Sequence, residues 1–273
     1  MTAARRYLPS HPVDLVRSML PIGLLVLGAA IPALRIPVLI AVGAGAGVAI
    51  ARAAPVRWTW AAAVPVALSL VWGIVPAPLA AIDGSDCANP ASPVATWRAL
   101  EAAVVLAMLA ALAVVLKASG ASLSLRRPPR PWGRWAVIGF LATGPVALLV
   151  GPYVARPFFG DVGYQVVLGA FVPALLFAAS NGIMEELIYR GALLGWSARV
   201  MGLGPAVVGQ AVVFGLAHSG SDVVGFQLPL MLALGVGGLL AGVIAVRTRS
   251  LLVPIAIHIG FDIPIYFAFA CGT

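Results

Sequence analysis

The chain alternates between long runs of hydrophobic residues and short polar or basic segments. A helix needs about 20 mostly apolar residues to cross a bilayer, and inside lipid its backbone groups must pair within the chain. Nine stretches approach that length, of which the second and seventh are short: 18–34, 36–51, 58–82, 99–116, 135–154, 166–197, 204–218, 226–246 and 251–270. The pattern predicts an all-α fold, a polytopic membrane helix bundle of eight or nine transmembrane helices.

The composition supports the same class of protein. Of 273 residues, 62% are hydrophobic and 10% are charged, and the mean hydropathy is +1.04. No soluble globular protein of this size needs so much apolar surface. We therefore expect an integral membrane protein that forms one structural domain, with N-terminal transmembrane helices in residues 1–165 and the remaining helices in residues 166–273.

The basic residues gather in short segments between the apolar runs. The formal net charge is +8, and the densest cluster comprises Lys117, Arg126, Arg127, Arg130 and Arg134. Lys and Arg accumulate in cytoplasmic loops, so this segment and the N-terminus are both assigned to the cytoplasmic side of a multi-pass protein of the plasma membrane. The cluster contains one aromatic residue, Trp132, and no repeated aromatic–basic pattern, which argues against nucleic acid as a partner.

Two cysteines, Cys87 and Cys271, fall on the opposite, oxidising side in this layout. A disulfide is permitted there if their backbones approach within about 7 Å. The alternative is a pair of separate thiols. The two residues form no C-x-x-C motif, so they do not indicate a metal site.

Two adjacent carboxylates and an arginine interrupt the sixth apolar stretch, in the segment N-G-I-M-E-E-L-I-Y-R at 181–190. Each charge inside a bilayer costs about 2.5–3.5 kcal/mol, so the cluster indicates a functional site unless it lies at the aqueous end of a helix. Residues four apart share a helix face, so Glu186 can pair with Arg190. Glu185 points elsewhere and could serve as a general base.

A histidine follows on the next helix, where Phe214 and His218 are four residues apart. The midpoint between Glu185 and His218 falls at 201–202, within the turn signal Gly-Leu-Gly-Pro at 202–205. A helical hairpin about that turn would bring the carboxylate and the imidazole to the same depth in the membrane.

The last apolar stretch contains His258 and Asp262, again four residues apart. A histidine beside a carboxylate suits either a metal or an oriented imidazole. The third histidine, His11, lies in the polar N-terminal arm and is expected to be inert. Polar residues that converge from three helices favour a functional site, and the absence of H-E-x-x-H excludes a zincin helix.

The ordered set of three motifs resembles the CPBP family of intramembrane proteases. This family includes the type II CAAX prenyl endopeptidases and the bacteriocin-processing, Abi-type proteases. The resemblance covers roughly 171–270, and the first 165 residues carry no part of it. The motifs are Glu185-Glu186-x-x-x-Arg190, Phe214-x-x-x-His218 and His258-x-x-x-Asp262.

The resemblance implies a catalytic core in 166–273, with a conical cavity that opens to the cytosol and to lipid. It also implies a role for each motif. The roles are water activation by Glu185 and His218, oxyanion stabilisation by His258 with Asp262, and support of the site by Glu186, Arg190 and Phe214.

The last motif departs from the family, which often has Asn at that position. Asn can donate a hydrogen bond to an oxyanion, whereas an ionised Asp262 can only accept one. Asp262 could be protonated, could orient His258, or could help to hold a metal. A zinc site formed by His218, His258 and a carboxylate, Asp262 or Glu185, is consistent with the residue types, so metal dependence is left open.

These observations predict an endopeptidase embedded in the bilayer that hydrolyses a peptide bond near the membrane surface. Its partner would be a peptide or protein substrate, and the sequence leaves open whether that substrate is lipidated. One alternative is a proton-coupled transporter, because His and Glu in membrane helices also build proton relays. Another is a catalytically silent scaffold or immunity protein.

Overall fold

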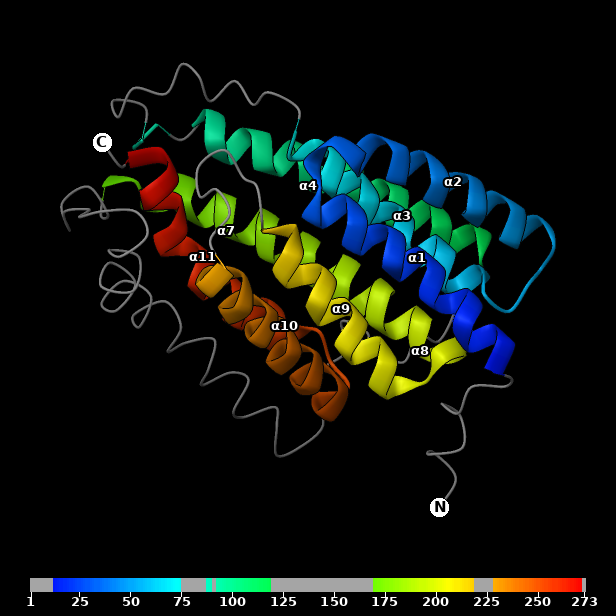
Figure 1. Ribbon diagram of the computed structural model, residues 1–273. Helices are drawn as coiled ribbons and strands as arrows, with labels where there is room; N and C mark the ends of the chain where they lie inside the picture. The colour runs from blue at the N-terminus through cyan, green and yellow to red at the C-terminus, as the bar shows by residue number, and fades with distance from the viewer. Residues whose placement is uncertain (1–11, 75–86, 90–91, 119–168, 219–227, 272–273) are drawn as a thin grey trace. The chain divides into compact units, whose positions relative to one another are not determined.

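The computed structural model describes residues 12–74, 87–89, 92–118, 169–218 and 228–271, and all regular structure within these ranges is helical (Figure 1). The elements, in chain order, are α1 (Pro12–Ala30), the 3-10 turn η2 (Pro32–Leu34), α2 (Arg35–Ala51), α3 (Arg57–Trp72), α4 (Pro93–Val115), α7 (Phe171–Glu185), the π-helix η5 (Glu186–Leu194), α8 (Gly195–Met201), α9 (Leu203–Ala217), α10 (Leu228–Thr248) and α11 (Leu252–Cys271).

The predicted all-α polytopic fold is confirmed, and most helix bounds lie within a few residues of the apolar stretches. The first stretch is an exception, because α1 ends at Ala30 and the 3-10 turn η2 separates it from α2. Pro32 lies at the start of η2. Proline has no backbone N–H and cannot continue an α-helix. The predicted span at 135–154 lies outside the described residues.

Several helices have the length and composition of membrane spans. Within the described residues, four meet both criteria: Pro32–Ala51, Pro93–Val115, Phe171–Met201 and Leu228–Thr248. Shorter apolar helices occur at Leu15–Ala30, Leu203–Ala217 and Leu252–Phe267.

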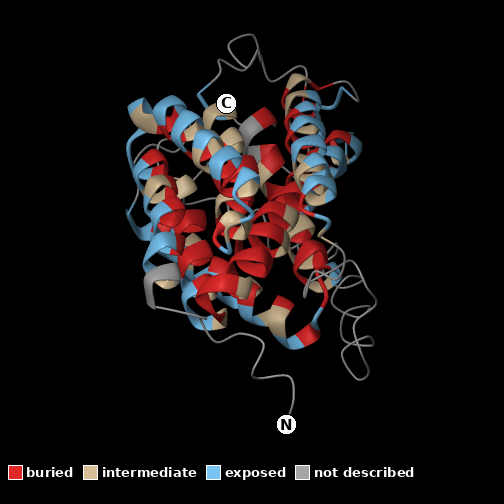
Figure 2. Ribbon diagram, turned by 90° about the vertical axis from the view of Figure 1, so that its right-hand side faces the viewer, coloured by how far each residue is buried: buried red, intermediate tan, exposed pale blue. Residues whose placement is uncertain are grey.

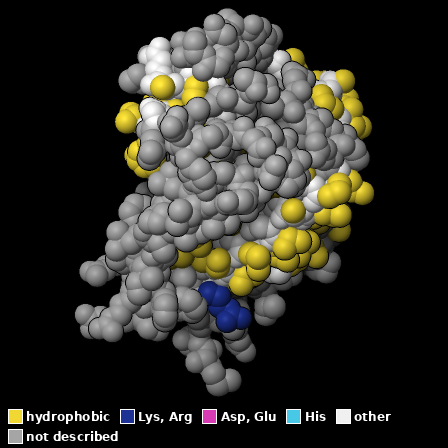
Figure 3. Space-filling view, turned by 90° about the vertical axis from the view of Figure 1, so that its left-hand side faces the viewer, with side chains coloured by type: hydrophobic (Ala, Val, Ile, Leu, Met, Phe, Trp, Pro, Cys, Tyr) yellow, Lys and Arg dark blue, Asp and Glu magenta, His cyan; other side chains and the backbone are white. Residues whose placement is uncertain are grey.

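Large apolar side chains point outward from these helices. Val16 is 71% exposed, Ile40 66% and Leu232 61%. On the face drawn in Figure 3, most of the described side chains are hydrophobic. A water-soluble surface avoids such apolar area, whereas lipid accepts it. The protein is therefore an integral membrane protein.

The chain divides into two compact units, each of which is considered by itself. Unit 1 comprises 1–75, 105–124 and 187–249, and unit 2 comprises 76–104, 125–186 and 250–273. The predicted division at residue 165 lies outside the described residues and stays a prediction.

In unit 1, α1 packs against α2, α3, α8 and α9, and α9 packs against α10. The α9–α10 contact depends on glycines. A Cβ at Gly215 would lie 2.8 Å from the carbonyl oxygen of Met231 on α10, and one at Gly238 would lie 3.0 Å from the ring of Phe214 on α9. Small residues let membrane helices approach closely. Figure 2 shows buried positions along one side of many helices and exposed positions along the other.

In unit 2, α7 packs against α11. A Cβ at Gly182 would lie 3.1 Å from both the backbone nitrogen and the side chain of Ile259, so this glycine sets a close α7–α11 contact. Towards one end of the pair, Phe177 and Tyr266 belong to one buried apolar cluster, and their ring centroids are 5.8 Å apart.

The segment before α4 is tied to α11 by a hydrogen bond. The hydroxyl of Tyr266 donates to the backbone oxygen of Cys87 at 2.8 Å. Cys87 is buried and disulfide-bonded, as the sequence permitted. The side chain of Cys271, the other cysteine, lies outside the described residues.

Candidate active site

The carboxyl-terminal half of α7 presents a line of functional side chains. Phe177, Asn181 and Glu185 are spaced four apart and so lie on one face of the helix. All three are buried, and Glu186 follows at the last turn with only 1% of its surface exposed. Buried carboxylates are costly unless hydrogen-bonded, so their partners show what the site is built to hold.

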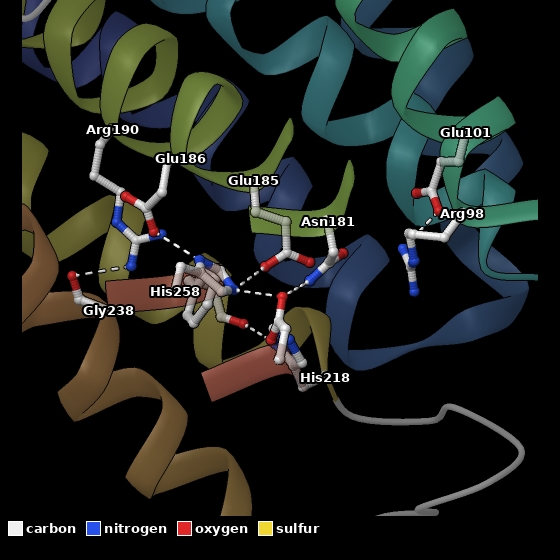
Figure 4. Close-up of polar contacts among 11 residues, drawn as sticks. Arg98, Glu101, Asn181, Glu185, Glu186, Arg190, His218, Gly238 and His258 are labelled. Atoms are coloured by element: carbon white, nitrogen blue, oxygen red, sulfur yellow. Dashed lines mark hydrogen bonds and ion pairs between the residues drawn. The ribbon is translucent and has the colours of Figure 1, made fainter. Parts of the chain in front are cut away.

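The imidazole of His258, on α11, is the centre of this cluster (Figure 4). Its Nδ1 lies 2.8 Å from Oε1 of Glu186. An ionised carboxylate only accepts hydrogen bonds, so Nδ1 carries a proton and its N–H donates a hydrogen bond to Oε1 of Glu186. This contact fixes the orientation of the ring and directs Nε2 away from Glu186.

Nε2 of His258 faces two further carboxylates. Oε2 of Glu185 and Oδ2 of Asp262 each lie 3.5 Å from it. These separations are longer than good hydrogen bonds, which fall near 2.7–3.2 Å for nitrogen and oxygen. Unit 2 thus brings together four of the predicted site residues: Glu185, Glu186, His258 and Asp262.

Asn181 is a member of the cluster that the motifs did not reveal. Its amide Nδ2 donates to Oδ2 of Asp262 at 2.7 Å, and both residues are buried. Asp262 therefore accepts a hydrogen bond through Oδ2, which favours an orienting role over a donating one. A signal was present in the sequence, because Asn181 lies one helical turn before Glu185 on the same face.

The acid pair coincides with a change of helix type. The α-helix ends at Glu185, and the nine residues from Glu186 to Leu194 form a π-helix that leads into α8. A π-turn bonds residue i to i+5, and such turns are frequent at functional sites.

Three of the predicted site residues belong to unit 1. Arg190 donates to the backbone oxygen of Gly238 at 3.4 Å, and its guanidinium lies 4.4 Å from the ring centroid of Phe214. That ring also packs against the imidazole of His218, with centroids 4.8 Å apart. Phe214 thus links the predicted arginine and histidine. The pairing of Glu186 with Arg190 stays a prediction.

The tautomer of His218 follows from its backbone contact. Nδ1 lies 2.8 Å from the backbone oxygen of Phe214. A carbonyl oxygen can only accept, so Nδ1 carries the proton and the neutral ring leaves Nε2 as an acceptor. Such an imidazole can orient or deprotonate a water molecule.

The turn predicted between the two helices is present. α8 ends at Met201, Gly202 has φ 85°, and α9 begins at Leu203 and packs against α8. Positive φ favours glycine, which explains the position of the turn. The expectation that Glu185 faces His218 stays a prediction.

A metal site would need several His, Cys, Asp or Glu side chains close together. Among the described residues, no group of three or more His, Cys, Asp or Glu side chains is arranged to hold a metal ion. In unit 2, the two nitrogens of His258 face Glu186 on one side and Glu185 with Asp262 on the other. These four side chains are joined by one hydrogen bond, between His258 and Glu186, and by two longer contacts from Nε2 of His258.

Comparison with known proteins bears on the residues that carry the site. Residues 167–264 match the family model described as Type II CAAX prenyl endopeptidase Rce1-like. This segment belongs to the CAAX protease family. The family resemblance of the motifs is thereby confirmed, and the match supports a CAAX-type peptidase with a peptide or protein substrate at a membrane. No curated protein and no solved structure matches the chain.

All of the helices that carry candidate residues fall within the matched CAAX protease segment. It includes α7, η5, α8, α9 and α10, together with the part of α11 that holds His258 and Asp262. Within unit 2 the clustered polar groups of this segment are three carboxylates, one imidazole and one amide.

Proposed function

We propose that this CAAX-type protease hydrolyses a peptide bond by activating water with Glu185 and His218. Glu185 is the general base. Its Oε2 is buried and has no hydrogen-bond partner among the described residues. An acceptor in that condition is suited to take a proton from water, because the unmet bond is supplied only when the water binds.

The reaction balances with these groups alone. The water gives a proton to Glu185, and its oxygen forms a bond to the scissile carbonyl carbon. The tetrahedral intermediate carries the negative charge on the former carbonyl oxygen. When the carbon–nitrogen bond breaks, the proton held by Glu185 passes to the leaving nitrogen, so a carboxyl and an amine product result.

His218 would orient the attacking water through Nε2. The support for this role is the hydrogen bond from its Nδ1 to the carbonyl of Phe214, which leaves Nε2 as an acceptor. His258 would stabilise the oxyanion through Nε2, and it can donate there while Nδ1 donates to Glu186 when the ring is protonated. The surrounding carboxylates would balance the charge of that imidazolium.

Asp262 would orient His258 and would not contact the oxyanion itself. It accepts from Asn181, and its Oδ2 lies 3.5 Å from Nε2 of His258. Glu186 would hold the opposite side of the ring. The single observation that carries the proposal is this imidazole held between Glu186 on one nitrogen and Glu185 with Asp262 on the other.

The distribution of basic residues indicates how the chain is oriented in the membrane. We propose a plasma-membrane protein with a cytoplasmic N-terminus, so that the basic segment 117–134 lies in the cytoplasm. A lipidated substrate would reach the site from the bilayer, and an unmodified peptide would reach it from water. Paired substrates with and without a lipid chain would distinguish these routes.

The decisive experiment replaces the proposed base, Glu185, by a glutamine of the same shape. A second variant removes the imidazole of His218. Glu185→Gln and His218→Ala, purified and reconstituted in liposomes, should each lower kcat for peptide cleavage by about 10²- to 10⁴-fold, the usual contribution of a general base. Ile183→Ala is a matched control because Ile183 is exposed on the same helix. Cleavage at the wild-type rate by Glu185→Gln would refute the proposed function.

A further inference from the structure

Two groups near Glu185 carry hydrogen-bonding capacity that the described chain does not use. One is the amide oxygen of Asn181. Nδ2 of this residue donates to Asp262, so the amide orientation is fixed and Oδ1 is the atom that remains. Oδ1 is buried and has no hydrogen-bond partner among the described residues. An unmet buried acceptor costs about 1–3 kcal/mol, which a donor from a bound molecule would recover.

The other group is the guanidinium of Arg98, on α4 in unit 2. Its Nη1 donates to Oε2 of Glu101 at 2.6 Å, and its CZ lies 5.7 Å from the ring centroid of Phe177. Glu101 is buried, whereas 32% of the Arg98 side chain is exposed. One edge of the guanidinium is therefore anchored. A guanidinium has five N–H donors, so others remain available on the exposed side.

Asn181 lies on one face of α7, and the guanidinium of Arg98 lies over Phe177 on the same face. Phe177, beneath Arg98, and Asn181 precede Glu185 by two turns and one turn. Figure 4 shows Asn181 between Glu185 and Arg98. The face therefore offers, in order, a candidate base, an acceptor and a cationic donor.

The backbone of a peptide offers the matching groups. Each residue supplies one N–H donor and one carbonyl acceptor. A helix rises about 1.5 Å per residue, so Asn181 lies about 6 Å and Phe177 about 12 Å from Glu185 along the axis. An extended peptide advances about 3.3 Å per residue. These lengths correspond to about two and about four residues from the scissile bond.

We propose that Asn181 and Arg98 form a substrate-binding subsite for the main chain on one side of the scissile bond. Oδ1 of Asn181 accepts from a backbone N–H, and the guanidinium of Arg98 donates to a main-chain oxygen about four residues from the cleaved bond. That oxygen belongs either to a peptide carbonyl or to a terminal carboxylate. The inference rests on the proposed function, because it places the scissile bond at Glu185.

The role of Arg98 is tested with peptides of graded length. The probe is an internally quenched peptide that the purified full-length protein cleaves in liposomes, with the cleaved bond located by mass spectrometry. On one side of that bond, removing residues up to the fourth should raise KM for the wild type about 10- to 100-fold, the range for a hydrogen bond to a charged group. Arg98→Met should already have the raised KM with the full-length peptide, and truncation of the peptide should not raise its KM further.

Two controls separate binding from folding. Arg98→Met alone changes the surroundings of buried Glu101, so the paired variant Arg98→Met/Glu101→Met removes both charges together. Arg57→Met removes an arginine with a similar ring contact, 5.5 Å from the Trp58 centroid in unit 1. Arg57→Met should keep the wild-type KM. Equal sensitivity to truncation in the wild type and in both Arg98 variants would overturn the proposal.

The role of Asn181 is tested by methylating single backbone nitrogens of the same peptide. Methylation about two residues from the cleaved bond should weaken cleavage by the wild type about 5- to 10-fold, as expected for loss of one neutral hydrogen bond. Asn181→Leu, or Asn181→Ala if the leucine variant does not fold, should be insensitive to that methyl group. A methylation effect that is unchanged in these variants would contradict the assignment.

Two further comparisons complete the test. If the acceptor is a terminal carboxylate, amidation of the peptide terminus should raise KM as much as Arg98→Met does. If the acceptor is a peptide carbonyl, amidation should leave KM unchanged. Both results support the subsite. Continued cleavage by Glu185→Gln with a normal dependence on Arg98 would instead refute the proposed base and leave the subsite intact.

Discussion

The contact between Glu186 and His258 makes a quantitative prediction about catalysis. Glu186 is almost fully buried, and its Oε1 accepts from Nδ1 of His258 at 2.8 Å. A hydrogen bond to a charged group contributes about 1.5–3 kcal/mol. Since about 1.4 kcal/mol corresponds to a tenfold change in rate, Glu186→Gln should lower kcat/KM about 10- to 100-fold. The glutamine keeps the volume and an acceptor oxygen, so the free energy of unfolding should change little.

Removal of the side chain should be more damaging. Glu186→Ala deletes the acceptor, leaves a cavity and breaks a buried polar pair, which costs about 3–5 kcal/mol. We expect a lower midpoint of thermal unfolding in detergent together with loss of cleavage. Ile183→Ala on the exposed side of α7 provides the baseline for both measurements.

A double-mutant cycle isolates the contact itself. The cycle combines Glu186→Gln with His258→Gln and compares kcat/KM for the four proteins. If Glu186 acts through its hydrogen bond to His258, the coupling energy should be about 1.5–3 kcal/mol, and Glu186→Gln should cost little once His258 has been replaced. Fully additive losses would refute the reasoning, because Glu186 would then act independently of His258.

Two other predictions concern the framework of unit 2. Gly182→Val should separate α7 from α11, since even a Cβ at this position would lie 3.1 Å from the backbone nitrogen of Ile259; we expect a loss of about 1–3 kcal/mol in unfolding experiments and reduced cleavage. An unchanged melting temperature would contradict this packing. Cys87→Ser removes a disulfide and should cost about 2–5 kcal/mol. Wild-type protein in reductant should show the same loss, and reductant should not affect the variant further.

The pattern of apolar residues was sufficient to predict the helices, because a bilayer imposes their length and composition. The site was predicted in part. The motifs identified Glu185, Glu186, His258 and Asp262, which unit 2 brings into one cluster. The four-residue spacing placed His258 beside Asp262 because both lie on the α-helix α11.

Other features could not be read from the same pattern. The fourth apolar stretch, 99–116, leaves out Arg98, whereas α4 begins at Pro93. A charged side chain interrupts an apolar run whether or not it lies on a helix. The contact of Glu186 with His258 joins residues 72 positions apart, and sequence spacing carries no information on such a tertiary contact.

The π-helix from Glu186 to Leu194 has a consequence for comparing this protein with its relatives. A widened turn accommodates an additional residue without breaking the helix. Two homologous chains could therefore keep the same fold while differing by one residue between the acid pair and the turn at Gly202. An alignment that forbids gaps inside helices would then pair the wrong positions, so alignments of this stretch should permit a single-residue insertion there.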